Sequence, residues 1–428
     1  MTVLSLKNTL LFLLIVMCSC GSKSQEADDC CPEQNPKPQI TPIPGANQTE
    51  EYLPLLQGKR VAVVANQTSG INNGKKDLEF MATTATGDTL MRARIAQTHL
   101  VDSLLARGIN IVKVFAPEHG FRGRADAGEA VKDGVDTKTG LPLLSLHGKH
   151  RKPKPEQLSD VDIIVFDIQD VGVRFYTYIS TMSLVMEAAA QAGVPVIVLD
   201  RPNPNGHYID GPTMLKEHTG FLGMHTVPLV YGMTIGEYAL MVNGEGWLED
   251  GIKADLTVIK NTAYNHRSKY RLPVRPSPNL PNYIAVNLYP SLGLAEGTNL
   301  NAGRGTEYQF QILGSPYLPK EKYTYQYTPQ PNFGSKYPKH QGTECNGFFL
   351  GQQPYLSKVD LQWIVQAYRD HTKKDEFFNT ANFTTHAGTP LLQQQIQQGL
   401  SAEEIRASWQ PEIEAFKKIR AKYLLYEE

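Results

Sequence analysis

The sequence predicts an α/β protein in which a Rossmann-like parallel sheet domain is followed by a smaller α+β domain. Short apolar runs alternate with helical patterns through roughly the first 250 residues, and this alternation then stops. The chain has 428 residues, which exceeds the size at which a single hydrophobic core usually stops growing. We therefore expect a Rossmann-like domain at 52–250, an α+β domain at 251–428, and the functional cleft between them.

Five apolar runs are the predicted strands of the sheet: Val61–Ala65, Ile109–Ala116, Leu141–Leu146, Ile163–Ile168 and Val194–Leu199. Each run leads into ionisable or amide side chains, in order Asn66 and Gln67, Glu118 and His119, His147, Asp167 with Gln169 and Asp170, and Asp200 with Arg201. Loops at the carboxyl ends of parallel strands converge on one crevice, so we expect a single site there. The alternative for any one strand is that its loop is polar because it faces water.

Two helices are expected within this domain. Arg92–Arg107 spaces apolar residues at helical intervals, and Gly108 follows it as glycine commonly follows a helix. Tyr178–Ala192 is followed in the same way by Gly193. Helices of this length between strands favour right-handed parallel crossovers.

The pattern changes beyond residue 250. A short strand is predicted at Leu256–Ile259, and Leu272–Pro290 is rich in proline and asparagine with little periodicity. Leu391–Tyr426 is expected to be helical, with its core contacts made by Trp409, Phe416, Ile419, Leu424 and Leu425.

The N-terminus is typical of a secreted protein. Lys7 precedes the apolar run Leu10–Met17, which is too short to cross a bilayer and has the proportions of a signal sequence. Cys20 lies where a bacterial lipoprotein is processed, so we expect a signal peptide at 1–19, a lipid on Cys20 and a polar tether at 20–51. The expected location is the bacterial cell envelope, on its periplasmic or surface face. Of the other cysteines, Cys18 leaves with the leader and Cys30, Cys31 and Cys345 are interpreted as incidental, with a bridge from Cys30 or Cys31 to Cys345 as the alternative.

Charge and motifs exclude several classes of function. The chain has 42 basic and 43 acidic residues, without the basic excess of a nucleic-acid-binding protein. It contains no G-x-S-x-G, P-loop or H-E-x-x-H motif, and Gly303-Arg304-Gly305 does not complete a dinucleotide-binding loop. We expect neither a cofactor nor a metal.

The remaining polar residues suit a sugar. Glycoside hydrolysis needs a proton donor, usually a carboxylic acid with a raised pKa, and partial desolvation after an apolar strand could raise the pKa of Glu118. His119 and Arg122 are close enough in sequence to orient it. The alternative is that Glu118 only caps the turn formed with Pro117 and Gly120.

Further candidates offer acceptors, stacking surfaces and cations for a sugar. Arg174 and, from the second domain, Arg304 could bind a substrate carboxylate in a bidentate manner. The other candidate binding residues are Asn66, Asp167, Gln169, Asp170, Tyr176, Tyr178, Asp200, Arg201, Glu296 and Asn299. Two alternatives stay open: Asp170 caps a helix while the tyrosines pack, and Asp200-Arg201 is an ion-paired turn.

These segments together carry a resemblance. Residues 117–123 (PEHGFRG), 166–178 (FDIQDVGVRFYTY), 200–204 (DRPNP) and 296–299 (EGTN) resemble the NamZ-type (YbbC-like) exo-β-N-acetylmuramidases. The similarity extends from Gly58 to Tyr426, without a departure at these motifs. The segment Met81–Asp88 could not be aligned.

The resemblance implies an enzyme that releases N-acetylmuramic acid from non-reducing ends of peptidoglycan fragments, with Glu118 as the catalytic acid. The residues fit that chemistry: Arg174 or Arg304 could bind the lactyl carboxylate, and Asp167 or Asp170 could orient a nucleophilic acetamido group or activate water. The stereochemical outcome stays open. The alternatives are a non-catalytic lipid-anchored glycan-binding protein and a β-N-acetylglucosaminidase.

Overall fold

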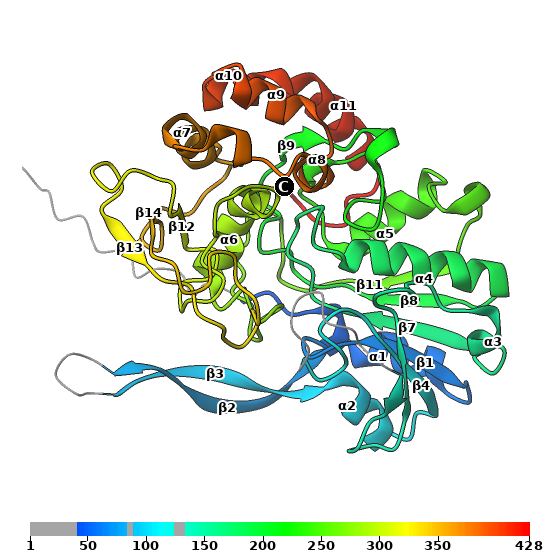
Figure 1. The fold of residues 1–428 in the computed structure, drawn as a ribbon. Helices are drawn as coiled ribbons and strands as arrows, with labels where there is room; N and C mark the ends of the chain where they lie inside the picture. Colours follow the sequence, from blue (N-terminus) through cyan, green and yellow to red (C-terminus); the bar gives the residue numbers. More distant parts are fainter. Residues whose placement is uncertain (1–40, 84–88, 124–132) are drawn as a thin grey trace, which may run out of the picture. The chain divides into compact units, whose positions relative to one another are not determined.

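The computed structural model describes residues 41–83, 89–123 and 133–428 (Figure 1). The leader, residues 20–40 of the predicted tether, Cys20, Cys30 and Cys31 lie outside the described residues. The prediction of a tether is wrong for residues 41–51, because Ile43 exchanges two backbone hydrogen bonds of 2.9 Å with Thr262 and Ala46 is fully buried. Residues 41–428 form one compact unit, and the division at residue 250 stays a prediction. No helix among the described residues is both long and apolar enough to cross a membrane.

The main sheet has seven strands in the order β11-β8-β7-β1-β4-β6-β5, and all neighbours pair in parallel except β5 and β6. The strands are β1 (Val61–Ala65), β4 (Ile111–Ala116), β5 (Gly134–Val135), β6 (Pro142–Ser145), β7 (Ile163–Asp167), β8 (Val196–Leu199) and β11 (Leu256–Ile259). The five predicted strands and Leu256–Ile259 are therefore present, and the predicted fold class is confirmed.

The order of these strands places a ligand crevice. From β1 the chain builds outward through β4 to β6, then returns to the other side of β1 and builds outward through β7, β8 and β11. The direction of building reverses between β1 and β7, and open parallel sheets bind ligands outside the carboxyl ends at such a switch point. Asn66 and Asp167 stand there.

Helices cover both faces of the sheet. Alternate strand residues face two separate cores, with Val61 and Val63 in one and Ala62 and Val64 in the other. The first core contains residues of α1 (Thr49–Leu56) and α2 (Leu100–Ala106), and the second those of α4 (Tyr178–Ala192) and α5 (Ile235–Gly244). The helix α4 has its predicted bounds, and Gly193 ends it with φ 68°.

The helix predicted at Arg92–Arg107 is wrong in its first half. Residues Thr89–His99 form β3, which pairs antiparallel with β2 (Gly70–Thr83) in a long hairpin, and α2 begins only at Leu100 (Figure 1). The His99 side chain accepts a hydrogen bond from the Val101 N–H and so caps α2. Pairing with a strand upstream decided the conformation, and no local helical spacing could reveal it.

The elements outside the seven-stranded sheet are smaller antiparallel sheets and further helices, some of them between the strands of the main sheet. Besides the β2-β3 hairpin, the antiparallel sheets are β10-β9, with β9 (Asp210–Thr213) and β10 (Pro228–Val230), and β12-β14-β13, with β12 (Ile312–Ser315), β13 (Tyr325–Tyr327) and β14 (Cys345–Phe349). The helices are α3 (Pro155–Leu158), α6 (Tyr283–Leu292), α7 (Gln362–Asp370), α8 (Thr380–Ala387), α9 (Leu391–Gln397), α10 (Ala402–Ser408) and α11 (Gln410–Arg420), with short 3-10 turns η1 (Gly45–Asn47), η2 (Lys216–His218), η3 (Glu249–Gly251), η4 (Gly293–Gly297) and η5 (Lys374–Glu376).

Two details differ from the expected C-terminal pattern. The supposedly aperiodic stretch 272–290 contains most of α6, which the Asn282 side chain caps. The C-terminal helical segment is three helices that end at Arg420 rather than at Tyr426. Trp409 and Phe416 are buried as expected, and Cys345 is a buried free cysteine among the described residues.

Candidate active site

Glu118 stands on a strained turn directly after β4. The Gly120 N–H donates to the Pro117 carbonyl at 3.0 Å, and His119 adopts φ 70° although it is not a glycine. A left-handed backbone at such a residue costs on the order of 1 kcal/mol and persists only where the surroundings impose it. His119 is buried, whereas Glu118 is half-buried and its Oε2 accepts from the Thr177 hydroxyl at 3.2 Å.

Asp170 is a second carboxylate, in the loop after β7. It is only 3% exposed, and its Oδ2 accepts from the Gly172 N–H at 2.7 Å and from the Tyr231 hydroxyl. Its Oδ1 is buried and accepts no hydrogen bond from the described residues. Burial raises the pKa of Asp170 to about 6, because the charged form loses its hydration.

A cluster of tyrosines connects the two carboxylates. The rings of Tyr176 and Tyr178 meet edge to face at 4.8 Å, and Tyr289 of α6 lies 6.1 Å from Tyr176. Burial, and then the negative charges of Glu118 and Asp170, raise the pKa of Tyr178, and both carboxylates also act on Tyr289. The two carboxylates therefore lie close enough to influence the same phenol groups.

The second part of the chain contributes an ion pair. Arg304 Nε donates to Glu296 Oε1 at 2.7 Å, and the guanidinium lies over the Phe310 ring. Burial opposes the ionisation of Glu296, but Arg304 and Lys339 outweigh it and the pKa of Glu296 is lowered. Burial also disfavours the charge on Arg304, but the charges of Glu296 and Glu118 raise its pKa overall. We call Glu118, Asp170, Tyr176, Tyr178, Tyr289, Glu296 and Arg304 the acid–tyrosine cluster.

Two amides shape the switch point beside this cluster. Asn66 is fully buried, and its Oδ1 accepts from the Thr68 N–H at 2.8 Å and the Thr68 hydroxyl at 2.6 Å. The Gln169 side chain donates to the carbonyls of Asp170 and Pro202, both at 2.8 Å. The Asn66 bonds fix the loop after β1 internally, and the Gln169 bonds fix the loop after β7 to the loop after β8 and so position Asp170.

The predicted acids Asp167 and Asp200 are internal. Asp167 forms a bidentate pair with Arg201, at 2.6 and 2.9 Å, and both side chains are almost completely buried. Asp200 is fully buried and accepts from five donors, namely the N–H groups of Arg201 and Gly236, the hydroxyls of Thr234 and Tyr426, and the Asn261 amide. This differs from the substrate-binding role expected for them, because Arg201 neutralises the charge of Asp167 and donors inside the protein already fill the acceptor positions of both carboxylates.

Arg174 also differs from its expected role as a carboxylate clamp. It is fully buried, and its two terminal nitrogens donate to four backbone carbonyls, those of Pro212, Val227, His386 and Ala387. The last two belong to the C-terminal end of α8, where a cation is favoured by the helix dipole. Arg174 therefore binds structural elements together.

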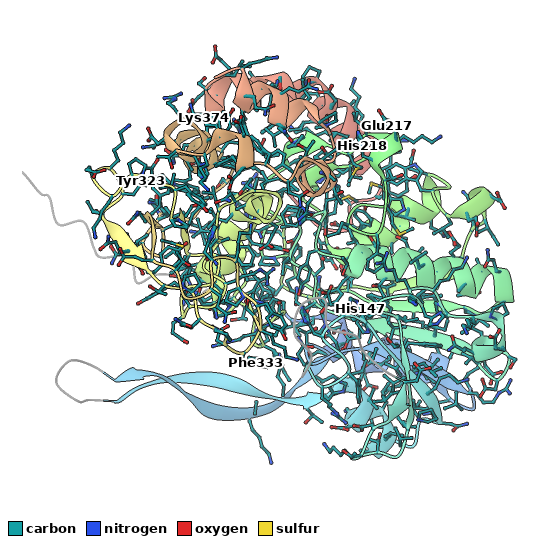
Figure 2. All side chains as sticks on the ribbon, in the orientation of Figure 1. His147, Glu217, His218, Tyr323, Phe333 and Lys374 are labelled. Atoms are coloured by element: carbon teal, nitrogen blue, oxygen red, sulfur yellow. The ribbon has the colours of Figure 1, made fainter. Side chains whose placement is uncertain are left out.

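Arg122, Asn299 and His147 make their contacts elsewhere. Arg122 pairs with Asp136 at 2.8 Å and with Asp102 at 3.3 Å. The Asn299 amide oxygen accepts from the Ser315 hydroxyl at 2.9 Å. His147, which is labelled in Figure 2, follows β6. Its side chain is half-buried. Among the described residues, no hydrogen bond or ion pair joins these three to the acid–tyrosine cluster.

Sequence reasoning missed Thr177, Tyr231 and Tyr289. Thr177 was adjacent to two candidates, and its hydroxyl position could not be read from the sequence. Tyr289 could have been found from the helical spacing of Ala285, Leu288 and Leu292 after the capping residue Asn282. Tyr231 follows a three-residue strand that carries no periodic signal.

Among the described residues, no group of three or more His, Cys, Asp or Glu side chains is placed to hold a metal ion. The family model "Exo-beta-N-acetylmuramidase NamZ, N-terminal" matches residues 61–284, and its C-terminal counterpart matches residues 287–426. The chain belongs to the NamZ exo-β-N-acetylmuramidase family. The predicted resemblance is thereby confirmed, and the break between the two family models falls just before the middle of α6.

Relatives support the membership in the NamZ family over nearly the whole chain. The chain is 38% identical over 395 residues to the peptidoglycan β-N-acetylmuramidase NamZ of Bacillus subtilis (strain 168), covering 88% of this chain and 89% of the relative. Two crystal structures of DUF1343 family proteins from Bacteroides fragilis NCTC 9343 are similar, with TM-scores of 0.79 and 0.75 at 39% and 28% identity. Each comparison covers 91% of this chain and 100% of the other.

Proposed function

We propose that the protein is an exo-acting glycoside hydrolase that releases N-acetylmuramic acid from non-reducing ends of peptidoglycan fragments. The family membership and the named activity of the Bacillus subtilis relative support this class of reaction. The observation that carries the proposal is the position of Glu118, on an imposed turn at the carboxyl end of the sheet and within electrostatic range of Tyr178, Tyr289 and Arg304.

Glu118 is the general acid in this proposal. Cleavage of a glycosidic bond requires a proton on the leaving oxygen, and a carboxyl group fixed beside the bond supplies it. The Thr177 hydroxyl donates to one carboxyl oxygen and so restrains the orientation of the carboxyl group. His119 is a positioning residue, since its backbone conformation sets the direction of Glu118.

Asp170 assists the reaction as the second carboxylate of the acid–tyrosine cluster. Its Oδ1 is the acceptor position that no described residue fills, and an acetamido N–H of the sugar would fill it. A hydrogen bond from the acetamido N–H to Asp170 would orient the acetamido group for attack on the anomeric carbon. Such substrate-assisted hydrolysis is a recognised exception to the mechanism that uses two carboxylates. The Asp170 carboxylate could instead activate a water molecule for the attack, which is the second route to hydrolysis.

Arg304 binds the lactyl carboxylate that distinguishes N-acetylmuramic acid from N-acetylglucosamine. Only its Nε is engaged by Glu296, and its side chain is 24% exposed. A guanidinium with free terminal nitrogens forms bidentate bonds with a carboxylate. Arg174 cannot do so while its terminal nitrogens bind four carbonyls.

The decisive assay compares Glu118→Gln with wild type on a chromogenic N-acetylmuramide and on the matching N-acetylglucosaminide. We expect the variant to lose about 10²- to 10⁴-fold in kcat on the muramide, the usual contribution of general acid catalysis. Residual activity within tenfold of wild type would remove Glu118 from this role. A wild type that binds N-acetylmuramyl-N-acetylglucosamine without releasing monosaccharides would be a glycan-binding protein, and a preference for the glucosaminide would make it a glucosaminidase.

We also propose that Cys20 carries a lipid that anchors the protein in the bacterial envelope. The support is the sequence alone, namely the short apolar run before Cys20 and the polar stretch after it. Labelling with a fatty acid should mark the wild type, and Cys20→Ala should abolish both the label and membrane sedimentation. An equally labelled variant would contradict the proposal.

A further inference from the structure

A cavity of about 370 Å³ lies outside the acid–tyrosine cluster. One wall is the segment 269–271, another is the first half of α6, and the third is the loop 351–355. The cavity and the cluster share no lining residue. The helix α6 contributes to both, because Tyr283 lines the cavity whereas Tyr289 belongs to the cluster. The volume is within the range of small-molecule sites.

The first wall is strongly basic. Residues 265–275 contain four cations and no acid, and Lys269 and Arg271 line the cavity. Neither side chain forms a hydrogen bond or ion pair with a described residue. Each lies against a tyrosine instead, Lys269 at 5.2 Å from the Tyr355 ring centroid and Arg271 at 4.2 Å from that of Tyr283. Two cations without neutralising acids, in a chain of net charge −1, concentrate positive potential at this cavity.

The other walls are fixed in place and supply neutral polar groups. The Tyr355 hydroxyl donates to the Pro204 carbonyl at 2.6 Å. The Asn287 side chain bonds to both backbone groups of Leu356, at 2.7 and 3.0 Å. The exposed amides of Gln352 and Gln353 can donate and accept, as sugar hydroxyl and acetamido groups require. A cavity formed in advance of binding loses little conformational entropy when it is filled.

We propose that this cavity is a second, non-catalytic saccharide site that binds a carboxylate-bearing sugar residue of a glycan strand. The cations match the carboxylate, the tyrosines match the apolar ring faces, and the amides match the hydroxyl groups. The choice of a muramic-acid glycan as the ligand rests on the proposed function. Engagement of a second part of the polymer would raise the effective concentration of chain ends at the acid–tyrosine cluster.

The test measures binding and turnover separately. Binding of peptide-free strands of alternating N-acetylglucosamine and N-acetylmuramic acid is measured on the full chain in a Glu118→Gln background, which prevents hydrolysis. We expect Lys269→Gln/Arg271→Gln to weaken this binding at least fivefold. In the otherwise wild-type protein, the same pair of changes should leave kcat/KM for a small chromogenic muramide within twofold.

The matched control removes the same charge elsewhere. Lys216→Gln/Lys418→Gln changes two exposed lysines that do not line the cavity, and should bind the strands like the parent. The proposal is overturned if the cavity variant binds within twofold of its parent, if the control weakens binding equally, or if free stem peptide rather than glycan displaces the strands. Uncharged chitin oligosaccharides that bind as tightly as the strands would also overturn it. If the wild-type protein does not hydrolyse the chromogenic muramide but the cavity variant still binds strands more weakly, the proposed activity is contradicted and the second saccharide site is supported.

Discussion

Glu118 and Asp170 are two carboxylates in different surroundings within one site. Glu118 is half-buried on a turn, whereas Asp170 is almost completely buried and has one oxygen without a donor among the described residues. Different environments allow two acids to serve different roles in one reaction. At the scale of single residues, this difference leads to a prediction about pH.

The pH dependence of kcat/KM should contain an ionisation near 6 that belongs to Asp170. The proposed role needs the carboxylate, so activity should rise as pH increases through about 6, the pKa to which burial raises Asp170. Asp170→Asn should remove this limb of the profile as well as lowering the maximum. A variant profile with the same acidic limb would assign the ionisation to another group.

Asp170 also affects stability, with a defined sign. Its folded-state pKa of about 6 is above the ordinary value of 3.8 for an aspartate, so its contribution to stability is fully present below pH 3.8 and is lost as pH rises through 6. The difference in free energy of unfolding between Asp170→Asn and wild type should therefore shift in favour of the variant between pH 4 and pH 7, by at most about 3 kcal/mol. Urea denaturation at several pH values measures it, and a shift in the opposite direction would contradict the raised pKa.

Arg304 should determine the preference for muramic acid. Arg304→Lys retains the charge but loses bidentate geometry, so we expect KM for the muramide to rise about tenfold, equivalent to about 1.4 kcal/mol, without a change for the glucosaminide. Arg122→Lys is the matched control, because Arg122 pairs with Asp102 and Asp136. Equal effects of the two variants would show that Arg304 has no special contact with the carboxylate.

At the scale of elements, Arg174 connects strands to a helix. Its guanidinium joins carbonyls at β9 and β10 to the C-terminal end of α8, which is more than 200 residues away in the chain. Arg174→Met should lower the free energy of unfolding by about 3–5 kcal/mol, because four buried carbonyls lose their donors. Arg369→Met, at an exposed position of α7, should leave the denaturation midpoint unchanged. A stable Arg174→Met protein with a raised KM would instead restore the substrate role predicted from the sequence.

For some helices and strands, the local sequence pattern was sufficient to predict where the element begins and ends. The helix α4 and the strand β1 have the bounds that periodicity and Gly193 predicted, because both are buried against elements that their own apolar residues specify. Residues 92–99 had acceptable helical spacing, yet they pair with β2. In that segment the partner strand supplied the hydrogen bonds, and local propensity was too weak to compete.

At the scale of the whole molecule, the segments matched by the two family models are joined by buried polar contacts. Asp210 of β9 accepts from Arg406 at 2.8 Å and from the Trp409 indole at 2.9 Å, and Asp200 accepts from the Tyr426 hydroxyl at 2.6 Å. The C-terminal helices and the end of the chain are thus attached to the sheet domain.

These contacts predict that the protein unfolds as one unit. A chain that begins at Thr41 should show a single calorimetric transition with equal calorimetric and van't Hoff enthalpies. Its kcat/KM on soluble muramyl fragments should equal that of the full-length protein. Two separate transitions would mean that the polar contacts do not couple the two segments.

The sequence by itself determined every strand of the main sheet except β5, the helix α4, the family and the position of Glu118 at a strand end, because apolar periodicity and turn chemistry are local properties of the chain. The tertiary structure alone decided which charged groups remain available to a ligand. Three residues look like binding residues in the sequence but are engaged inside the protein. Arg174 donates to distant backbone carbonyls, Asp167 pairs with Arg201, and Asp200 accepts from the Tyr426 hydroxyl. Whether a charge is neutralised internally depends on partners that folding brings from elsewhere. Arg304 keeps free donors because, among the described residues, only Glu296 accepts a hydrogen bond from its side chain, and it engages only Nε.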